Sequence, residues 1–91
     1  MKTAAIIPAY NEAGRIAAVL RALTTTSSVD EVIVVDDGST DGTASVVSHF
    51  PGVQVISLPR NRGKGGAMRE GALHTDADIL LFLDADLMGL T

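Results

Sequence analysis

Hydrophobic residues gather in four short runs along the chain. They span residues 3–9 (TAAIIPA), 31–37 (EVIVVDD), 53–58 (VQVISL) and 78–84 (DILLFLD). Each run is apolar along most of its length. Residues 31–37 form a continuous β-branched run, as expected for a strand covered on both faces. The hydrophobic pattern therefore predicts four strands.

Between the runs, the spacing of hydrophobic residues becomes helical. Residues 12–23 place apolar side chains at i, i+3, i+4 and i+7, the spacing of an amphipathic helix: Ile16, Val19, Leu20 and Leu23. Asn11 is of the residue type that caps such a helix. This segment predicts the first helix, with Asn11 as its N-cap.

Two further segments predict helices. For residues 41–50 we expect a cap at Ser39 or Thr40, and inward side chains at Val46, Val47 and Phe50. Residues 63–75 are rich in small residues. For this helix we expect inward side chains at Met68, Ala72 and Leu73.

The predicted elements alternate as βαβαβαβ. Strands that alternate with helices pair in parallel, through right-handed crossovers that place helices on both faces of the sheet. Four parallel strands still leave the order of the strands open, and the doubly wound arrangement places them 3-2-1-4. We predict this arrangement, an α/β fold with a three-layer Rossmann-like parallel sheet and strand order 3-2-1-4. Ligands in such sheets bind at the carboxyl ends of the strands, beside the point where the winding reverses.

Composition narrows the class of protein. The chain has 91 residues, 46% of them hydrophobic and 20% charged, which indicates one small globular domain. It has no cysteine, which excludes disulfides and thiolate metal sites and is compatible with the cytoplasm. The net charge of −4 does not suggest nucleic-acid binding. We expect a cytoplasmic domain, and whether the whole protein touches a membrane stays open.

Unusual polar clusters follow all four predicted strands at their carboxyl ends. These clusters are residues 8–12 (PAYNE), 36–39 (DDGS), 60–69 (RNRGKGGAMR) and 84–86 (DAD). The amino ends of the strands receive ordinary turn residues instead. Because the carboxyl ends of parallel strands share one edge, the clusters predict a functional site there.

Asp84 and Asp86 are one residue apart, so in an extended segment their side chains point the same way. Two such carboxylates repel each other unless a cation neutralises them. Hard cations such as Mg²⁺ or Mn²⁺ prefer oxygen ligands and leave positions for phosphate oxygens. The pair predicts a cation site, although a polar strand terminus is the alternative.

The segment 60–69 holds four of the seven basic residues. Glycines at a helix start let the backbone approach a phosphate, and a helix N-terminus favours anions. The segment is not a P-loop, because Gly65 rather than Ser or Thr follows Lys64. It predicts a phosphate-binding loop, against the alternative of a solvated loop.

The remaining candidates favour a nucleoside. Asp36 or Asp37 could accept hydrogen bonds from a base or a ribose, and Tyr10 could stack on a base or simply pack. We assign no catalytic role to His49 or His74, which lie near predicted helix C-termini. Together with the basic loop and the cation site, these residues predict a receptor for a nucleoside diphosphate with a bound metal.

Four stretches also carry a family resemblance. IIPAYNEAGRI, VIVVDDGSTDGT, NRGKGGAMREG and ILLFLDADL, in this order, resemble the N-terminal part of family 2 glycosyltransferases. The likeness is greatest to the polyprenyl-phosphate and dolichyl-phosphate mannose synthase-like branch. It implies the N-terminal half of the A-type nucleotide-sugar glycosyltransferase fold. It also implies inverting transfer of a sugar from a UDP- or GDP-sugar with Mg²⁺ or Mn²⁺, to an acceptor such as a lipid phosphate or a small molecule.

The resemblance also implies roles for individual residues. The nucleotide-sugar-binding residues would be Pro8, Tyr10, Glu12, Asp37, Gly38, Ser39, Lys64, Asp84 and Ala85. The metal ligands would be Asp86, the likelier direct one, and Asp84.

In the family, the acceptor site and the general base lie C-terminal to the Asp84-Ala85-Asp86 motif. We therefore expect residues 1–91 to be a donor-binding half-domain, truncated after this motif and inactive alone, with the catalytic base beyond Thr91. We also expect self-association through the outer edge of the strand at 78–84, because an apolar strand edge invites pairing.

Two other functions remain open. A haloacid-dehalogenase-like phosphatase would use Asp84 as its nucleophile, but Met88 stands where that motif has Thr or Val. A non-catalytic nucleotide-binding or assembly module is the other alternative. The sugar, the base and the acceptor are not determined by the sequence.

Overall fold

The computed structural model describes residues 1–25 and 28–84. Its elements alternate as predicted. They are β1 (Thr3–Ala9), α1 (Ile16–Thr24), β2 (Glu31–Asp36), α2 (Thr43–Val47), β3 (Val53–Ser57), α3 (Gly63–Leu73) and β4 (Ile79–Phe82).

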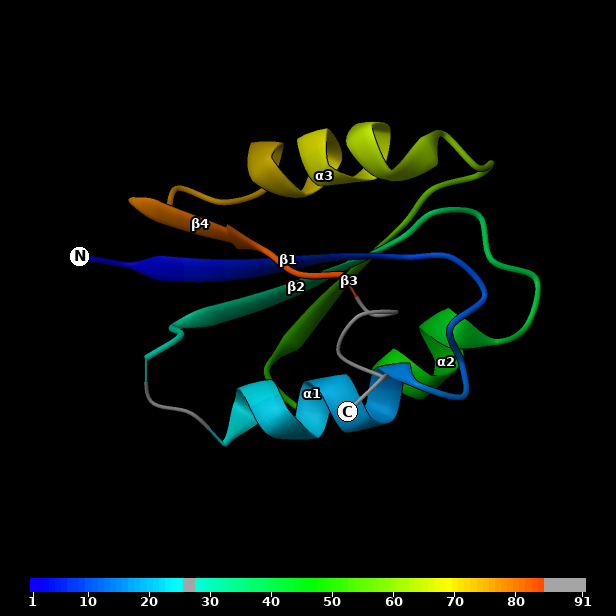
Figure 1. Cartoon of the computed structure of the whole chain (residues 1–91), viewed down its shortest axis with the longest axis horizontal. Coiled ribbons are helices and arrows are strands. Elements are labelled where there is room, and N and C mark those ends of the chain that lie inside the picture. Colours follow the sequence, from blue (N-terminus) through cyan, green and yellow to red (C-terminus); the bar gives the residue numbers. More distant parts are fainter. Residues whose placement is uncertain (26–27, 85–91) are drawn as a thin grey trace.

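The sheet has the order β3-β2-β1-β4, and its three strand pairs are parallel. Ile6 in β1 aligns with Ile33 of β2 on one side and with Phe82 of β4 on the other. Helices α1 and α2 cover one face, and α3 covers the other (Figure 1). The predicted three-layer sheet with strand order 3-2-1-4 is confirmed, and the winding reverses between β1 and β4.

Successive side chains of the inner strand β1 point to opposite faces of the sheet, so the strand contributes to a hydrophobic cluster on each face. Ile7 is fully buried with Ile16 and Leu20 of α1. Its neighbour Ile6 is fully buried on the other face, in the cluster that contains Ala67 of α3. Since both sides of β1 are covered, the strand is apolar and buried from Ala4 to Ala9.

The start of α1 differs from the prediction. The helix begins at Ile16, and Arg15, at its N-cap position, makes no side-chain capping bond. Asn11 adopts a left-handed conformation with φ 53°, and its Oδ1 accepts a hydrogen bond from the Thr40 backbone N–H at 2.9 Å. Asn11 as the cap was therefore wrong, because this side chain joins two loops instead.

Helix α2 is also shorter than predicted. Its N-cap is Gly42, with φ 87°, rather than Ser39 or Thr40. The Ser39 hydroxyl accepts a hydrogen bond from the Asn11 backbone N–H at 2.9 Å, so it serves the loop and not the helix. Val47 is fully buried, and Val46 packs half-buried against the same cluster, as does Phe50.

The inward face of α3 was predicted incorrectly at Leu73, whose side chain is 70% exposed. Ala67 and Gly71 are the buried residues of this helix, while Met68 and Ala72 are half-buried. A Cβ on Gly71 would lie 2.5 Å from Cγ2 of Ile6. The helix thus approaches the sheet through its smallest residues, which turns Leu73 outward.

No helix in residues 1–25 and 28–84 combines the length and the apolar character needed to cross a membrane.

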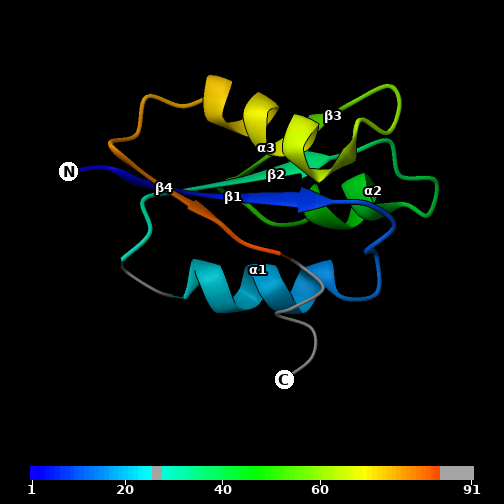
Figure 2. The same ribbon diagram turned by 45° about the horizontal axis from the view of Figure 1, so that its top comes forward.

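The edge strand β4 leads to a prediction about self-association. It lies outside β1 at the edge of the sheet (Figure 2), and Ile79, Leu81 and Phe82 are exposed on it. An apolar edge without charge is a template for pairing with another chain. We expect the mean mass in sedimentation equilibrium to rise with concentration, and Leu81→Lys to keep the chain monomeric.

Leu73→Lys is the matched control, because it places the same charge on an exposed leucine of α3, away from the strand edge. This variant should associate like the wild type. A wild-type mass that stays monomeric at all concentrations would contradict the prediction.

Candidate functional site

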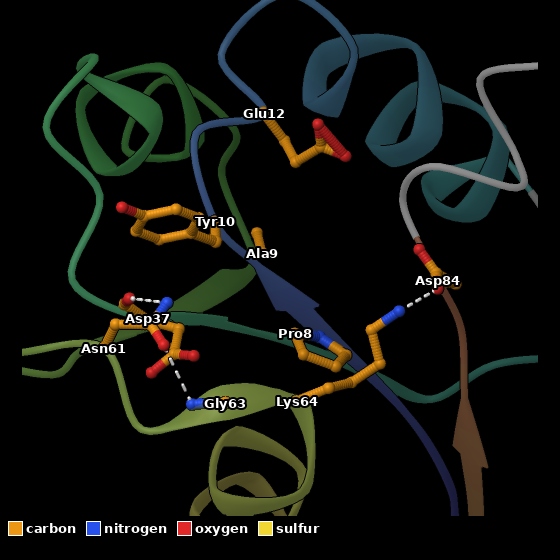
Figure 3. A pocket seen from close by; sticks show the side chains of 9 residues that line it. All are labelled: Pro8, Ala9, Tyr10, Glu12, Asp37, Asn61, Gly63, Lys64 and Asp84. Atoms are coloured by element: carbon orange, nitrogen blue, oxygen red, sulfur yellow. Dashed lines mark hydrogen bonds and ion pairs between the residues drawn. The ribbon is translucent and has the colours of Figure 1, made fainter.

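A pocket of about 190 Å³ lies at the carboxyl end of β1 (Figure 3). All four strands supply the segments around it. Its lining residues are Pro8, Ala9, Tyr10, Glu12, Asp37, Asn61, Gly63, Lys64 and Asp84. The polar clusters expected at one edge of the sheet therefore meet around a single cavity.

Most of the candidates from the sequence line this pocket. They are Pro8, Tyr10, Glu12, Asp37, Lys64 and Asp84. Gly38 and Ser39 are not among its lining residues. Ala85 and Asp86 lie outside the described residues, so the structure does not place the second carboxylate of the cation site.

Asp37 is almost fully buried, with 3% of it exposed, and two hydrogen bonds fix its position. Its backbone N–H donates to the Ala9 carbonyl at 2.8 Å, and its Oδ1 accepts the Arg62 backbone N–H at 2.7 Å. Such a charge-assisted bond fixes the direction of a carboxylate. Within residues 1–25 and 28–84, no hydrogen bond to the other oxygen, Oδ2, is found. Asp37 is therefore positioned to accept a donor from a ligand.

Asn61 was missed by the sequence reasoning. Its Nδ2 donates to the Asp37 carbonyl at 3.3 Å, and its Oδ1 accepts the Gly63 backbone N–H at 3.1 Å. The side chain thus joins the loop after β2 to the start of α3. A single Asn beside a glycine-rich helix start was the available signal, but turn formation explains such an Asn equally well.

Gly38 does not line the pocket but allows two of its loops to pack against each other. It has φ 77°, and a Cβ there would lie 2.7 Å from the backbone C of Arg60 and 2.7 Å from the backbone N of Asn61. The loops after β2 and β3 touch at this point. The glycine therefore permits the contact that brings the Arg62 N–H to Asp37.

A second set of bonds holds the loop after β1. The Glu12 N–H donates to the Thr43 hydroxyl at 3.0 Å, and the Ala13 N–H donates to Asp41 Oδ2 at 3.1 Å. The Thr43 hydroxyl hydrogen bond, followed by backbone N–H bonds, lowers the pKa of Asp41 below its ordinary value of 3.8. These bonds keep the backbone of Glu12 beside the pocket.

Tyr10 is 49% exposed and lines the pocket, so its ring is not packed into the core. His49 and His74 are exposed, and neither lines the pocket. Their Nδ1 atoms lie 2.8 Å from the carbonyl oxygens of Ser45 and Glu70, respectively. Of these three rings, Tyr10 is the one placed to meet a ligand.

Lys64 and Asp84 form an ion pair across the pocket. The Lys64 stem leaves the first turn of α3 and brings its ammonium group to Asp84 Oδ2 (Figure 3). The Lys64 side chain is 55% exposed and that of Asp84 is 25% exposed. Within the described ranges, no group of three or more Asp, Glu, His or Cys residues that could hold a metal is present. Of the two carboxylates expected to bind the cation, Asp84 is thus the one that the structure describes.

Comparison with known proteins decides the family. The sequence matches the family described as Glycosyl transferase family 2 over residues 4–88. The chain belongs to this family. Membership of family 2 leaves the phosphatase alternative without support, and Asp84 follows the fourth strand instead of the first, where that phosphatase motif normally lies.

Among curated proteins, the chain is similar to dolichyl-phosphate beta-glucosyltransferases. It is 40% identical to the Drosophila melanogaster protein, covering 94% of this chain and 31% of that protein. It is 37% identical to a Trichomonas vaginalis protein, covering 92% of this chain and 29% of that protein. The chain therefore spans about 30% of the length of these relatives.

Solved structures confirm the A-type glycosyltransferase fold. TarS from S. aureus superposes with a TM-score of 0.86 at 31% identity, covering 94% of this chain and 28% of that one. The mannosyltransferase PcManGT from Pyrobaculum calidifontis, solved with GDP-Man and Mn²⁺, superposes with a TM-score of 0.85 at 32% identity. The match covers 93% of this chain and 27% of that one. Glucosyl-3-phosphoglycerate synthase from Mycobacterium tuberculosis, solved with UDP-Glc and Mn²⁺, superposes with a TM-score of 0.81 at 32% identity. The match covers 92% of this chain and 33% of that one.

Proposed function

We propose that this chain binds the nucleoside diphosphate sugar of a family 2 hexosyltransferase. The observation that carries the proposal is the pocket itself, in which Asp37, Lys64 and Asp84 meet at the carboxyl edge of the sheet. The fixed carboxylate of Asp37 suits the nucleoside, and the ammonium group of Lys64 suits the diphosphate. The carboxylate of Asp84 suits the metal ion that accompanies the diphosphate. The UDP-Glc and GDP-Man of the solved relatives support a donor of this class.

Three side chains of the pocket have a chemical role toward the nucleotide in this proposal: Asp37, Tyr10 and Lys64. Asp37 Oδ2 accepts an N–H of the base or a ribose hydroxyl, and the exposed ring of Tyr10 stacks on the base. The start of α3 presents backbone N–H groups and the Lys64 ammonium to the diphosphate.

The donor set fits a hard divalent cation. Asp84 offers carboxylate oxygens at the pocket, and Mg²⁺ or Mn²⁺ needs one or two carboxylates in addition to diphosphate oxygens and water. Asp84 and Asp86 would hold the cation. Bound there, it would offset the charge that develops on the departing nucleoside diphosphate. The Mn²⁺ in two solved relatives supports this choice.

The acceptor we propose is dolichyl phosphate or another polyprenyl phosphate. The curated relatives support the dolichyl-phosphate branch, and their names give a glucosyltransferase, whereas the motifs resembled the mannose synthase-like branch and left the sugar open. We infer that the whole protein works in the cytoplasm against a membrane that holds the lipid. A phosphate acceptor is ionised at neutral pH, so the expected general base is essential only if the acceptor is a hydroxyl.

The test is isothermal titration of the chain with UDP and with GDP, each with and without Mn²⁺. We expect one nucleotide to bind in a Mn²⁺-dependent manner, and Asp84→Asn and Asp86→Ala each to abolish the dependence. Asp76→Asn, an exposed carboxylate paired with Lys2 at the opposite edge of the sheet, is the control and should bind normally. A folded chain that binds neither nucleotide at millimolar concentration would overturn the proposal.

A further inference from the structure

We propose that Lys64 exchanges partners during donor binding. It neutralises Asp84 when no divalent cation is bound, and it turns to a diphosphate oxygen when the cation takes its place. The inference rests on the proposed function and adds a coupling between the metal and the nucleotide.

The ion pair places two cations in competition for one oxygen atom. The Lys64 ammonium lies at Asp84 Oδ2, where a divalent cation bound to that oxygen would also have to lie. Like charges at such short range repel strongly, the more so where the surroundings hold little water. A cation that binds Asp84 must therefore displace the ammonium.

Lys64 is able to move once it is displaced. More than half of its side chain is exposed, and its flexible four-carbon stem starts in the first turn of α3. That turn is also where a diphosphate would meet the helix N-terminus. Rotation of the stem would thus carry the ammonium from the carboxylate to a diphosphate bound at that turn.

Other basic residues do not replace Lys64 in this role. Among the described residues, it is the one basic side chain that lines the pocket. Arg62, two residues earlier, pairs with Glu70 at 3.1 Å and contributes its backbone N–H to Asp37. The exchange therefore depends on Lys64.

The exchange makes metal and nucleotide bind cooperatively. A metal at Asp84 releases the ammonium for the diphosphate, and a diphosphate that attracts the ammonium exposes Asp84 to the metal. By linkage, each ligand must raise the affinity for the other by the same factor. Direct contact between the metal and the diphosphate adds to this effect but does not require Lys64.

Lys64→Met separates the two contributions, because it removes the charge and keeps the stem. Mn²⁺ binding is measured by electron paramagnetic resonance without nucleotide, and UDP and GDP binding by calorimetry with saturating Mn²⁺. We expect Lys64→Met to bind Mn²⁺ alone about fivefold more tightly, the scale of an exposed ion pair. We expect it to bind the nucleotide about tenfold more weakly, because a charged hydrogen bond is lost.

Two further variants control the experiment. Lys2→Met removes the chain's other lysine, which pairs with Asp76 and Glu31 at the opposite edge of the sheet, and should change neither affinity. Lys64→Arg keeps the charge and should keep Mn²⁺ binding near the wild-type value. A fold check by circular dichroism accompanies each variant.

The outcomes separate this inference from the proposed function. If Lys64→Met weakens nucleotide binding but leaves Mn²⁺ affinity within twofold of wild type, the exchange is wrong and donor binding stands. If Mn²⁺ affinity rises but nucleotide affinity is unchanged, Lys64 does not reach the diphosphate and the exchange is again wrong. If the wild type binds no nucleotide, both are overturned.

Discussion

Replacing Gly38 with Ala is expected to destabilise the chain by about 3 kcal/mol, the sum of a left-handed backbone penalty and a close contact. The new Cβ would lie 2.7 Å from backbone atoms of Arg60 and Asn61, and backbone cannot move aside as a flexible side chain can. Urea unfolding followed by circular dichroism measures the loss. Nucleotide binding should also weaken, because the loop that carries the Arg62 N–H to Asp37 must shift.

Gly42→Ala is the matched control. Gly42 has φ 87°, close to the 77° of Gly38, but a Cβ there would meet nothing within 4 Å. This variant should lose about 1 kcal/mol, the backbone penalty alone. Equal losses in the two variants would show that the contact between the two loops contributes nothing.

Replacing Asp37 with Asn is expected to weaken binding of the cognate nucleotide by about tenfold to a hundredfold, the scale of a lost charged hydrogen bond. An Asn at this position can still accept the Arg62 N–H through its Oδ1. However, it turns an NH₂ group toward the donor groups of the ligand. Calorimetry measures the affinity, and the stability should stay within about 1 kcal/mol of wild type, since the loop anchor is kept.

Asp78→Asn controls for the loss of charge. Asp78 also accepts a backbone N–H through its carboxylate, from Lys2 at 2.8 Å, but it lies at the amino edge of the sheet. Its variant should bind nucleotide normally. If Asp37→Asn bound nucleotide as tightly as wild type, Asp37 would have a structural role in the loop and no direct contact with the ligand.

The two pairs of variants test different parts of the site. Gly38 and Gly42 report on the contact between the loops after β2 and β3, whereas Asp37 and Asp78 report on contact with the ligand. A chain in which Gly38→Ala and Asp37→Asn both weaken binding, and only Gly38→Ala lowers stability, would match the arrangement of the pocket. Lys64→Met then addresses the metal and diphosphate part of the same cavity.

The sequence by itself determined the strands, their parallel pairing and the edge that carries the site, whereas the strand order 3-2-1-4 was an expectation from doubly wound folds that the sheet confirms. The continuous apolar run of β2 requires cover on both faces, and alternation with helices permits little other than a parallel sheet. Because parallel strands share one edge for their carboxyl ends, Tyr10, Asp37, Lys64 and Asp84 could be placed together without a structure. These features follow from local pattern and from the handedness of the chain.

Tertiary structure decided how the loops and α3 meet the sheet. Asn11 and Ser39 are of residue types that cap helices, but their side chains accept hydrogen bonds from a loop that is distant in sequence. In α3, Gly71 approaches Ile6 so closely that small residues face the sheet and Leu73 is exposed. Asn61 and the Lys64–Asp84 pair likewise depend on contacts between segments far apart in sequence. Local propensity does not contain these contacts, because they form when separate segments pack against each other.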